Sequence, residues 1–266
     1  MDDEQFRQLL DHFGYCWRGY RKVRKGVKKR VAKHMQQIGS RSIGDYLHAL
    51  QTDEHLREDC ERIMTVSVSR FFRDRVLWRI IGDDIVPHLL KEGGEKVKFW
   101  SAGCACGEEV YSLMILWESL KGKFDFMPIL EVWATDLNPD YLRRAEEGIY
   151  PLSSLKEIPL EQRKRYFTSH GEGSFYRIVP SLKRGITWMA RNLLLEFEES
   201  GFQIIFLRNS ILTYYRDEIK RPAFERVVGC LAEGGFLMIG SHEQLPAKNK
   251  QLLPFGGTTY IFKKLG

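Results

Sequence analysis

The pattern of apolar and polar positions divides the chain into an all-helical first quarter and a longer part in which strands alternate with helices. Between residues 5 and 64, apolar residues recur at the spacing of helices with one buried face. The pattern predicts helices over Phe6–Phe13, Tyr20–Ile38, Ile43–Leu50 and Leu56–Ile63, with Ser42 as the N-cap of the third. We therefore expect a small helical domain that ends, with its linker, at residue 75.

From residue 97 onward, apolar runs of strand length alternate with helical segments. Strands are expected at Lys98–Trp100, Leu130–Asp136, Phe202–Leu207, Phe236–Ile239 and Thr258–Phe262. Such alternation is typical of an α/β fold with a mostly parallel sheet, and the last strand is expected to be antiparallel at the edge. We assign residues 76–266 to this domain.

The alternation breaks at about residues 150–190. Two strand-like runs, Phe175–Val179 and Gly185–Met189, are separated by turn material. We expect an inserted β-subdomain here, with a short helix and a hairpin or small sheet that stands off the main fold.

The segment from Lys98 to Leu113 predicts a strand, a tight loop and a helix. Small residues in such a loop let the backbone approach a ligand, and the next helix offers unpaired N–H groups. The loop lacks the residues of a P-loop and of a dinucleotide fingerprint, and Glu108 and Glu109 would repel phosphate. A positively charged ligand is expected, and S-adenosylmethionine fits. The alternative is that the loop only closes a βα unit.

Polar residues follow two of the expected strands. Asp136 ends the strand that begins at Leu130, and Arg208 and Asn209 follow the strand that ends at Leu207. In α/β folds the ligand crevice lies at the carboxyl ends of the strands, so Asp136 could accept hydrogen bonds from a ribose. Alternatively, Asp136 only caps the helix that follows.

Positive charge is concentrated in one helix of the first domain. The net charge is +6, and no acidic residue occurs between Asp11 and Asp45. The candidate contacts to an acidic partner are Arg24, Lys25, Lys28 and Lys29. The alternative is a solvated helix face. An acidic protein and a nucleic acid could both supply the charge, but few aromatic residues interleave with the basic run, which disfavours nucleic acid.

The composition is that of an ordinary globular protein. No apolar run is long enough to span a bilayer, and the acidic start does not resemble a signal peptide, so we expect a cytoplasmic protein. The cysteines are scattered without the pairing of a zinc site, and Cys104 and Cys106 are interpreted as small apolar loop residues. No metal is expected, and nothing in the sequence requires more than a monomer.

Taken together, these segments resemble the CheR-type chemotaxis receptor methyltransferases, which transfer a methyl group from S-adenosylmethionine to receptor glutamates. The resemblance covers nearly the whole chain. It is carried by the basic helical domain and by the segments Phe71–Asp74, Trp100–Gly103, Gly107–Glu109, Ala134–Asp136, Gly148–Tyr150, Asn192–Leu194 and Arg208–Asn209. It implies a Rossmann-like methyltransferase sheet, and it implies an acidic helical region of a receptor's cytoplasmic domain as the partner of the basic helix.

The resemblance also implies roles for residues that match the family's motifs. Glu108 and the loop around Gly103 would meet the methionine part of the cofactor, and Asp136 would take the ribose hydroxyls. Arg73 would orient the substrate near the transferred methyl group. The full set of implied cofactor contacts is Ser67, Ser69, Arg73, Ala102, Gly103, Glu108, Asp136, Leu137, Asn192, Leu193, Arg208 and Asn209.

The chain departs from the family at one position near the methyl group. The family's tyrosine falls on Thr213, and Tyr214 is a candidate catalytic residue beside it. Adjacent residues point in different directions, so Tyr214 does not simply replace the family residue. Two alternatives follow: a CheR-like methyltransferase with a different acceptor, or a cofactor-binding regulatory protein with weak or no transferase activity.

Overall fold

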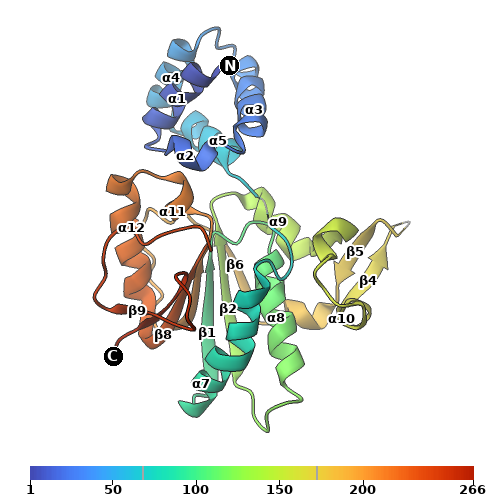
Figure 1. Cartoon of the computed structure of the whole chain (residues 1–266). Helices are drawn as coiled ribbons and strands as arrows, with labels where there is room; N and C mark the ends of the chain where they lie inside the picture. Colours follow the sequence, from blue (N-terminus) through green and yellow to red (C-terminus); the bar gives the residue numbers. More distant parts are fainter. Residues whose placement is uncertain (68, 172) are drawn as a thin grey trace.

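A computed structural model describes residues 1–67, 69–171 and 173–266 and shows a helical domain above an α/β domain (Figure 1). The helical domain contains α1 (Asp3–His12), α2 (Trp17–Tyr20), α3 (Arg24–Gln37), α4 (Ile43–Thr52) and α5 (Glu54–Met64). Its core includes Phe6, Val27, Val31 and Tyr46, all almost fully buried. The predicted N-cap is confirmed, because the Ser42 hydroxyl accepts a hydrogen bond from the Asp45 N–H at 3.1 Å.

One predicted helix of this domain is divided in two. The helix expected over Tyr20–Ile38 is interrupted by a turn at residues 21–23, and α3 begins only at Arg24. The turn separates α2 from α3, and the Tyr20 ring at the end of α2 is buried in the domain core. Apolar spacing alone does not reveal this break.

The α/β domain is built on a seven-stranded sheet in the order β6-β2-β1-β7-β8-β10-β9. Its strands are β1 (Lys96–Ala102), β2 (Ile129–Asp136), β6 (Ile186–Ala190), β7 (Phe202–Leu207), β8 (Leu231–Ile239), β9 (Leu252–Pro254) and β10 (Ile261–Lys264). The first five run parallel, and β10 pairs antiparallel with β8 and β9. The sheet confirms the predicted Rossmann-like α/β fold and its antiparallel last strand, which begins three residues later than expected.

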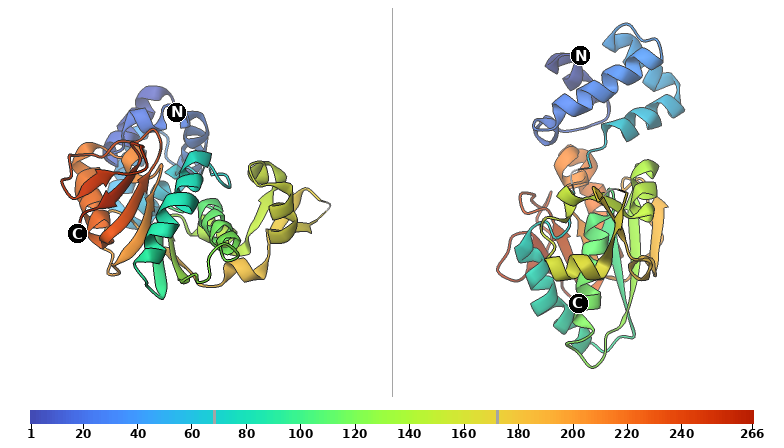
Figure 2. Two further views of the ribbon diagram at one scale, coloured as in Figure 1. Left: turned by 60° about the horizontal axis from the view of Figure 1, so that its bottom comes forward. Right: turned by 90° about the vertical axis from the view of Figure 1, so that its right-hand side faces the viewer.

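Helices cover both faces of this sheet, as the views in Figure 2 show. One face packs against α6 (Arg75–Ile80), the π-helix η1 (Ile81–Ile85), α7 (Val86–Lys91), α8 (Glu108–Leu120) and α9 (Pro139–Glu147). The other face packs against α12 (Asp217–Cys230) and the loop at residues 193–197. Successive strand residues point to opposite faces, so each strand contributes to both cores.

A small three-stranded sheet stands off the main fold, as predicted. It contains β3 (Ile149–Pro151), β5 (Phe175–Ile178) and β4 (Phe167–His170), in that order. The 3-10 helix η2 (Leu152–Leu155), α10 (Leu160–Tyr166) and the 3-10 helix η3 (Pro180–Lys183) complete the insertion.

The prediction that Gly185–Met189 belongs to this insertion is wrong. Residues 186–190 form β6, which pairs in parallel with β2 from Val132↔Ile186 to Asp136↔Ala190 at the edge of the main sheet. The run is short, and its partner strand is more than fifty positions earlier in the chain. Its proximity in sequence to β5 therefore suggested a hairpin that does not form.

The helical domain packs directly on the α/β domain through α2 and α11 (Ile211–Tyr214). The Cys16 N–H donates to the Tyr214 carbonyl at 2.7 Å, and Tyr15 forms an isolated bridge with Tyr215. A Cβ on Gly19 would lie 2.2 Å from the Thr213 carbonyl oxygen, so only glycine permits this approach. Within the described residues, no helix is both long and apolar enough to cross a membrane.

Candidate functional site

A cavity lies at the carboxyl ends of β1, β2, β6 and β7, where the helical domain meets the sheet. Two tyrosines of the helical domain, Tyr15 and Tyr20, form part of its wall. The α/β domain contributes Gly103, Ala105, Asp136, Leu137, Tyr141, Arg191, Asn192, Leu193, Asn209, Ser210, Ile211, Tyr214 and Tyr215, and the linker contributes Thr65 and Val66. The crevice is therefore at the position that the strand ends predicted.

The loop after β1 has a conformation that requires glycine. Gly103 has φ +89°, and a Cβ there would lie 2.9 Å from the Ser210 Cβ. The N–H groups of Gly103 and Cys104 both donate to the Thr135 carbonyl, at 2.8 and 2.9 Å. The loop is thus tied to the end of β2, and its backbone stays open to the cavity.

Cys104 and Cys106 are buried in this loop, as expected for small apolar residues. Burial raises the pKa of the Cys104 thiol well above its usual value and raises that of Cys106 to about 11. Thiols with raised pKa values are poor nucleophiles. Both cysteines therefore serve packing.

Asp136 lies at the centre of the crevice and is only 9% exposed. Its Oδ2 accepts a hydrogen bond from the Ala105 N–H, and its Oδ1 accepts one from the Asn138 N–H, both at 2.9 Å. The N-cap of α9 is Asn138, whose side chain accepts from the Asp140 N–H, so the interpretation of Asp136 as the helix cap is wrong. Two carboxylate oxygens offer about four acceptor sites, which leaves capacity for a diol.

Burial raises the pKa of the Asp136 carboxyl, and hydrogen bonds from the backbone of Asn138, Ala105 and Leu137 oppose this effect. These N–H donors stabilise the charged form.

Glu108 begins α8 and is 7% exposed. Its Oε2 is buried and has no hydrogen-bond partner among the described residues. The Ser69 hydroxyl lies within hydrogen-bonding reach of the Glu108 carboxylate. Burial raises the pKa of Glu108, and the Ser69 hydroxyl opposes this effect. An orphaned acceptor of this kind is costly unless a ligand satisfies it, and a cationic donor such as an ammonium group would do so.

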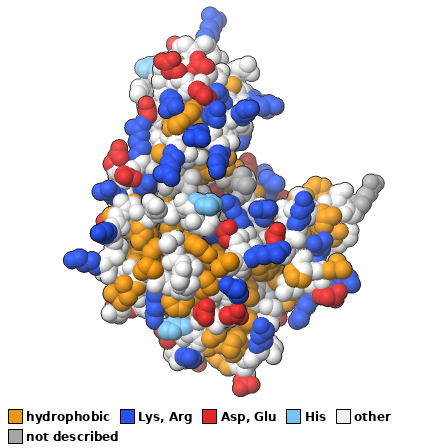
Figure 3. Space-filling model, viewed as in Figure 1, with side chains coloured by type: hydrophobic (Ala, Val, Ile, Leu, Met, Phe, Trp, Pro, Cys, Tyr) orange, Lys and Arg blue, Asp and Glu red, His pale blue; other side chains and the backbone are white. Residues whose placement is uncertain are grey.

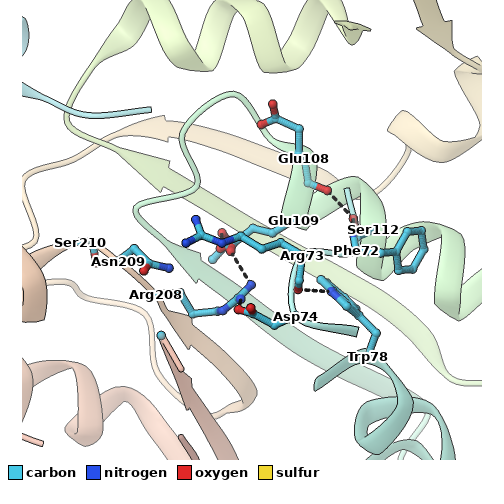
Figure 4. A network of polar contacts seen from close by, with 12 residues as sticks. Phe72, Arg73, Asp74, Trp78, Glu108, Glu109, Ser112, Arg208, Asn209 and Ser210 are labelled. Carbon is cyan, nitrogen blue, oxygen red and sulfur yellow. Dashed lines mark hydrogen bonds and ion pairs between the residues drawn. The ribbon is translucent and has the colours of Figure 1, made fainter. Parts of the chain in front are cut away.

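Arg208 forms the centre of a buried ionic network, shown in Figure 4. Its guanidinium pairs with Glu109 at 3.3 Å and with Asp74. Glu109 also accepts a hydrogen bond from the Ser101 hydroxyl at 2.7 Å. Burial raises the pKa of Glu109, and the charge of Arg208 opposes this effect. The network ties the start of α6 to β7, β1 and α8.

Arg73 and Ser69 line a second, smaller cavity that continues from the first. Both cavities share Val66, Gly103, Ala105 and Asn209. Figure 4 shows the Arg73 side chain extending toward Asn209, while its carbonyl accepts a hydrogen bond from the Trp78 indole at 2.8 Å. The guanidinium of Arg73 therefore faces the cavity from a backbone that Trp78 fixes.

The two candidate residues on α11 have different surroundings. The Thr213 hydroxyl donates to Glu243 Oε1 at 2.5 Å and is absent from the cavity lining. Tyr214 lines the cavity, and its ring lies 4.9 Å from that of Tyr20. Burial raises the pKa of Tyr214 to about 12, so its hydroxyl is neutral at physiological pH. Tyr214, rather than Thr213, therefore presents its side chain to the site.

The predicted partner-binding residues lie outside the cavity, on α3. Arg24 and Lys28 are half-buried and pair with Asp3 of α1, at 3.3 and 2.8 Å. Lys25 and Lys29 are exposed. Asp3 of α1 thus compensates part of the positive charge of α3. The sequence of α3 alone does not predict this pairing, because α3 contains no acidic residue.

The cavities bring most predicted site residues together and add others. Gly103, Asp136, Leu137, Asn192, Leu193, Ser69, Arg73, Arg208, Asn209 and Tyr214 line one or both cavities, whereas Ser67, Ala102, Glu108 and Thr213 are not among the lining residues. Sequence reasoning missed Tyr15, Tyr20, Thr65, Tyr141, Arg191, Ser210 and Tyr215. Arg191 follows β6 directly, so a correct assignment of that strand would have indicated it.

Comparison with known proteins identifies the family of the chain. The model of the family described as "CheR methyltransferase, SAM binding domain" matches residues 67–261. The chain belongs to the CheR methyltransferase family. Its cofactor is S-adenosylmethionine, and among the described residues no cluster of His, Cys, Asp or Glu could hold a metal ion.

Several curated relatives share this assignment. The chain is 32% identical to the chemotaxis protein methyltransferase of Listeria innocua, over 82% of this chain and 81% of that one. It is also 32% identical to chemotaxis protein methyltransferase 1 of Pseudomonas aeruginosa, over the same shares. The solved N-methyltransferase NodS of Bradyrhizobium japonicum matches at 19% identity, over 61% of this chain and 64% of that one, with a TM-score of 0.33.

Proposed function

We propose that this methyltransferase transfers the methyl group of S-adenosylmethionine to glutamate side chains in the cytoplasmic helical region of a chemoreceptor, and that it acts as a monomer in the cytoplasm. The observation that carries the proposal is the juxtaposition, in connected cavities, of a cationic side chain at Arg73 with the carboxylate of Asp136. The names of the relatives support the chemotaxis context.

The residues fit the cofactor group by group. Among the residues that the structure describes, the buried Oε2 of Glu108 has no hydrogen-bond partner and would complement an ammonium group, and Asp136 retains acceptor capacity for the ribose hydroxyls. Leu137, Asn192 and Leu193 provide the mixed apolar and amide wall that an adenine ring needs. Gly103 keeps the backbone close enough for the methionine part.

The chemistry asks little of the chain beyond placement. When bound, S-adenosylmethionine supplies a methyl group activated by a sulfonium. A glutamate carboxylate is ionised near neutral pH and can attack without a general base. Holding the reacting groups in line can contribute about 7–11 kcal/mol in favourable cases. We assign this positioning to Arg73, which would orient the acceptor carboxylate by charge-assisted hydrogen bonds.

The structure of the network suggests a supporting role for Arg208. Because its guanidinium is held by Glu109 and Asp74, we propose that Arg208 acts by fixing the residue next to Arg73. Asn209 and Tyr214 face the cavity and would complete the acceptor end. The exposed Lys25 and Lys29 of α3 would face acidic residues of the receptor.

Methyl transfer to a receptor fragment tests the proposal. Wild-type protein should incorporate label from S-adenosylmethionine that alkali releases, because carboxyl methyl esters are labile in base. The Arg73→Ala variant should lose about 100-fold in kcat, the effect of a misplaced reactant, while its affinity for S-adenosylhomocysteine stays near wild type. Arg79→Ala, an exposed arginine on α6, is the matched control.

Two other outcomes would point to different functions. Base-stable label would indicate a nitrogen acceptor and therefore a different substrate. Binding of S-adenosylhomocysteine without any transfer would favour a regulatory protein, for which the engaged hydroxyl at Thr213 is the motivating observation.

A further inference from the structure

A second hollow, outside the cofactor cavities, lies between the start of α6 and the insertion. This groove has a volume of about 450 Å³. Its apolar lining comes from Phe72 and Trp78 on one side and from Ile158 and Pro159 on the other. The rings of Phe72 and Trp78 pack edge to face at 5.4 Å, so this wall is rigid. The lining offers an apolar surface on which a partner's apolar side chain can be buried.

Cationic side chains border the groove. Lys156 is exposed, and Arg75 is exposed on the opposite side, where it also pairs with Glu157. Figure 3 shows further Lys and Arg side chains between the helical domain and the insertion, outside the lining of this groove. An apolar floor with a basic border fits an apolar residue flanked by acidic ones.

The groove adjoins the catalytic end of the cofactor site along the chain, although the two share no lining residue. Phe72 immediately precedes Arg73, and the Phe72 N–H donates to the Ser112 hydroxyl of α8 at 2.9 Å. The Trp78 indole donates to the Arg73 carbonyl. The groove wall and the backbone of Arg73 are therefore parts of one rigid unit. A helix that places a carboxylate near Arg73 would run close to the groove, because Phe72 of the groove wall is adjacent to Arg73 in the chain.

We propose that this groove receives an apolar side chain of the acidic acceptor helix, on the same helix face as the glutamate that is methylated. The inference rests on the function proposed above and adds how the acceptor glutamate is selected. Residues three, four or seven positions away share a helix face with the glutamate, so one of these would enter the groove. Arg75 and Lys156 would then contact acidic residues beside it.

Filling the groove tests the proposal directly. Gln162 borders it from α10, so Gln162→Trp should occupy the space. Lys164→Trp places the same bulk on the same helix outside the groove and is the control. For the receptor fragment, Gln162→Trp should raise KM about tenfold, the cost of leaving one apolar side chain unburied, with kcat within about twofold of wild type. Calorimetry with S-adenosylhomocysteine should give wild-type affinity for both variants, which also shows that they fold.

The acceptor supplies the second half of the test. Alanine at the apolar position three, four or seven residues from the glutamate should raise KM for wild-type enzyme. The same alanine should raise the KM of Gln162→Trp little further, because the two changes remove the same contact. Fully additive effects, or an unchanged KM for Gln162→Trp, would refute the groove assignment. The assignment would also be refuted if the wild-type protein is a dimer in solution and Gln162→Trp is a monomer, because a second copy of the chain would then fill the groove.

These outcomes are distinguishable from failure of the proposed function. If wild-type enzyme forms no base-labile ester on the receptor fragment, the glutamate acceptor itself is wrong. If wild-type enzyme forms the ester and Gln162→Trp has the same KM as the control Lys164→Trp, the proposed function stands and the groove assignment falls.

Discussion

Replacement of Arg208 by methionine should destabilise the protein far more than loss of an ordinary ion pair. The Arg208 side chain is 3% exposed, and its partners Glu109 and Asp74 are 12% and 28% exposed. Removing one member of a buried ionic group leaves uncompensated charge and costs about 3–5 kcal/mol of unfolding free energy. Methionine keeps much of the side-chain volume, so the loss reports on charge rather than on a cavity.

The pH dependence distinguishes this explanation from a packing defect. Burial raises the pKa of Glu109 above its ordinary value near 4.5, and Arg208 limits the rise. Without Arg208 the folded-state pKa rises further, so the folded state binds the proton more tightly than the unfolded state does. Stability of the variant should therefore fall as pH rises above 4.5, and the loss relative to wild type should be greater at about pH 8 than at about pH 5.

Urea denaturation followed by tryptophan fluorescence measures this difference. The control is Arg143→Met, because the pair of Arg143 with Asp140 is exposed on both sides (69% and 68%) and should contribute about 0–1 kcal/mol. If Arg208→Met costs no more than Arg143→Met, or if its cost is independent of pH, the reasoning about buried charge is refuted.

Three further predictions concern other parts of the molecule. Gly19→Ala should weaken S-adenosylhomocysteine binding in calorimetry, because its Cβ would meet the Thr213 carbonyl at 2.2 Å; Gly26→Ala, whose Cβ meets only a distant side-chain atom of another residue, should not. Thr213→Val should lower the urea unfolding free energy by about 1–3 kcal/mol, because Glu243 loses a hydrogen bond. Burial lowers the pKa of His34 below 6.5, so thermal stability should fall as pH decreases below 6.5, and His34→Gln should weaken that dependence, to which the lowered pKa of His12 also contributes.

The sequence predicted those elements whose signal is local. The strand Phe202–Leu207 agrees with β7 at both ends, because it is a continuous apolar run between polar residues. The strand β6 was assigned to the insertion, because a short edge strand carries no mark of its distant partner β2. Apolar spacing does not predict the break before α3 either, because the spacing continues through residues 21–23, where the structure has a turn.

The same distinction applies to the candidate site. Gly103 and Asp136 could be proposed from sequence because each belongs to a strand and the turn that follows it. The role of Arg208 within a buried network could not, since Asp74 lies 134 positions away in the chain and only the fold brings the two together. Tyr15 and Tyr20 give no sequence signal for a crevice that lies mostly in another domain.

Because α2 packs on α11, residues on both sides of the domain boundary predicted at residue 75 line the same cavity. Tyr20 forms part of the cavity wall and contacts Tyr214, which also lines the cavity. The basic helix α3 follows α2 after a three-residue turn, so a partner held by α3 acts on a domain that also shapes the cavity. A partner that orders this domain would pre-organise the cofactor wall, and by linkage the bound cofactor would strengthen partner binding to the same degree.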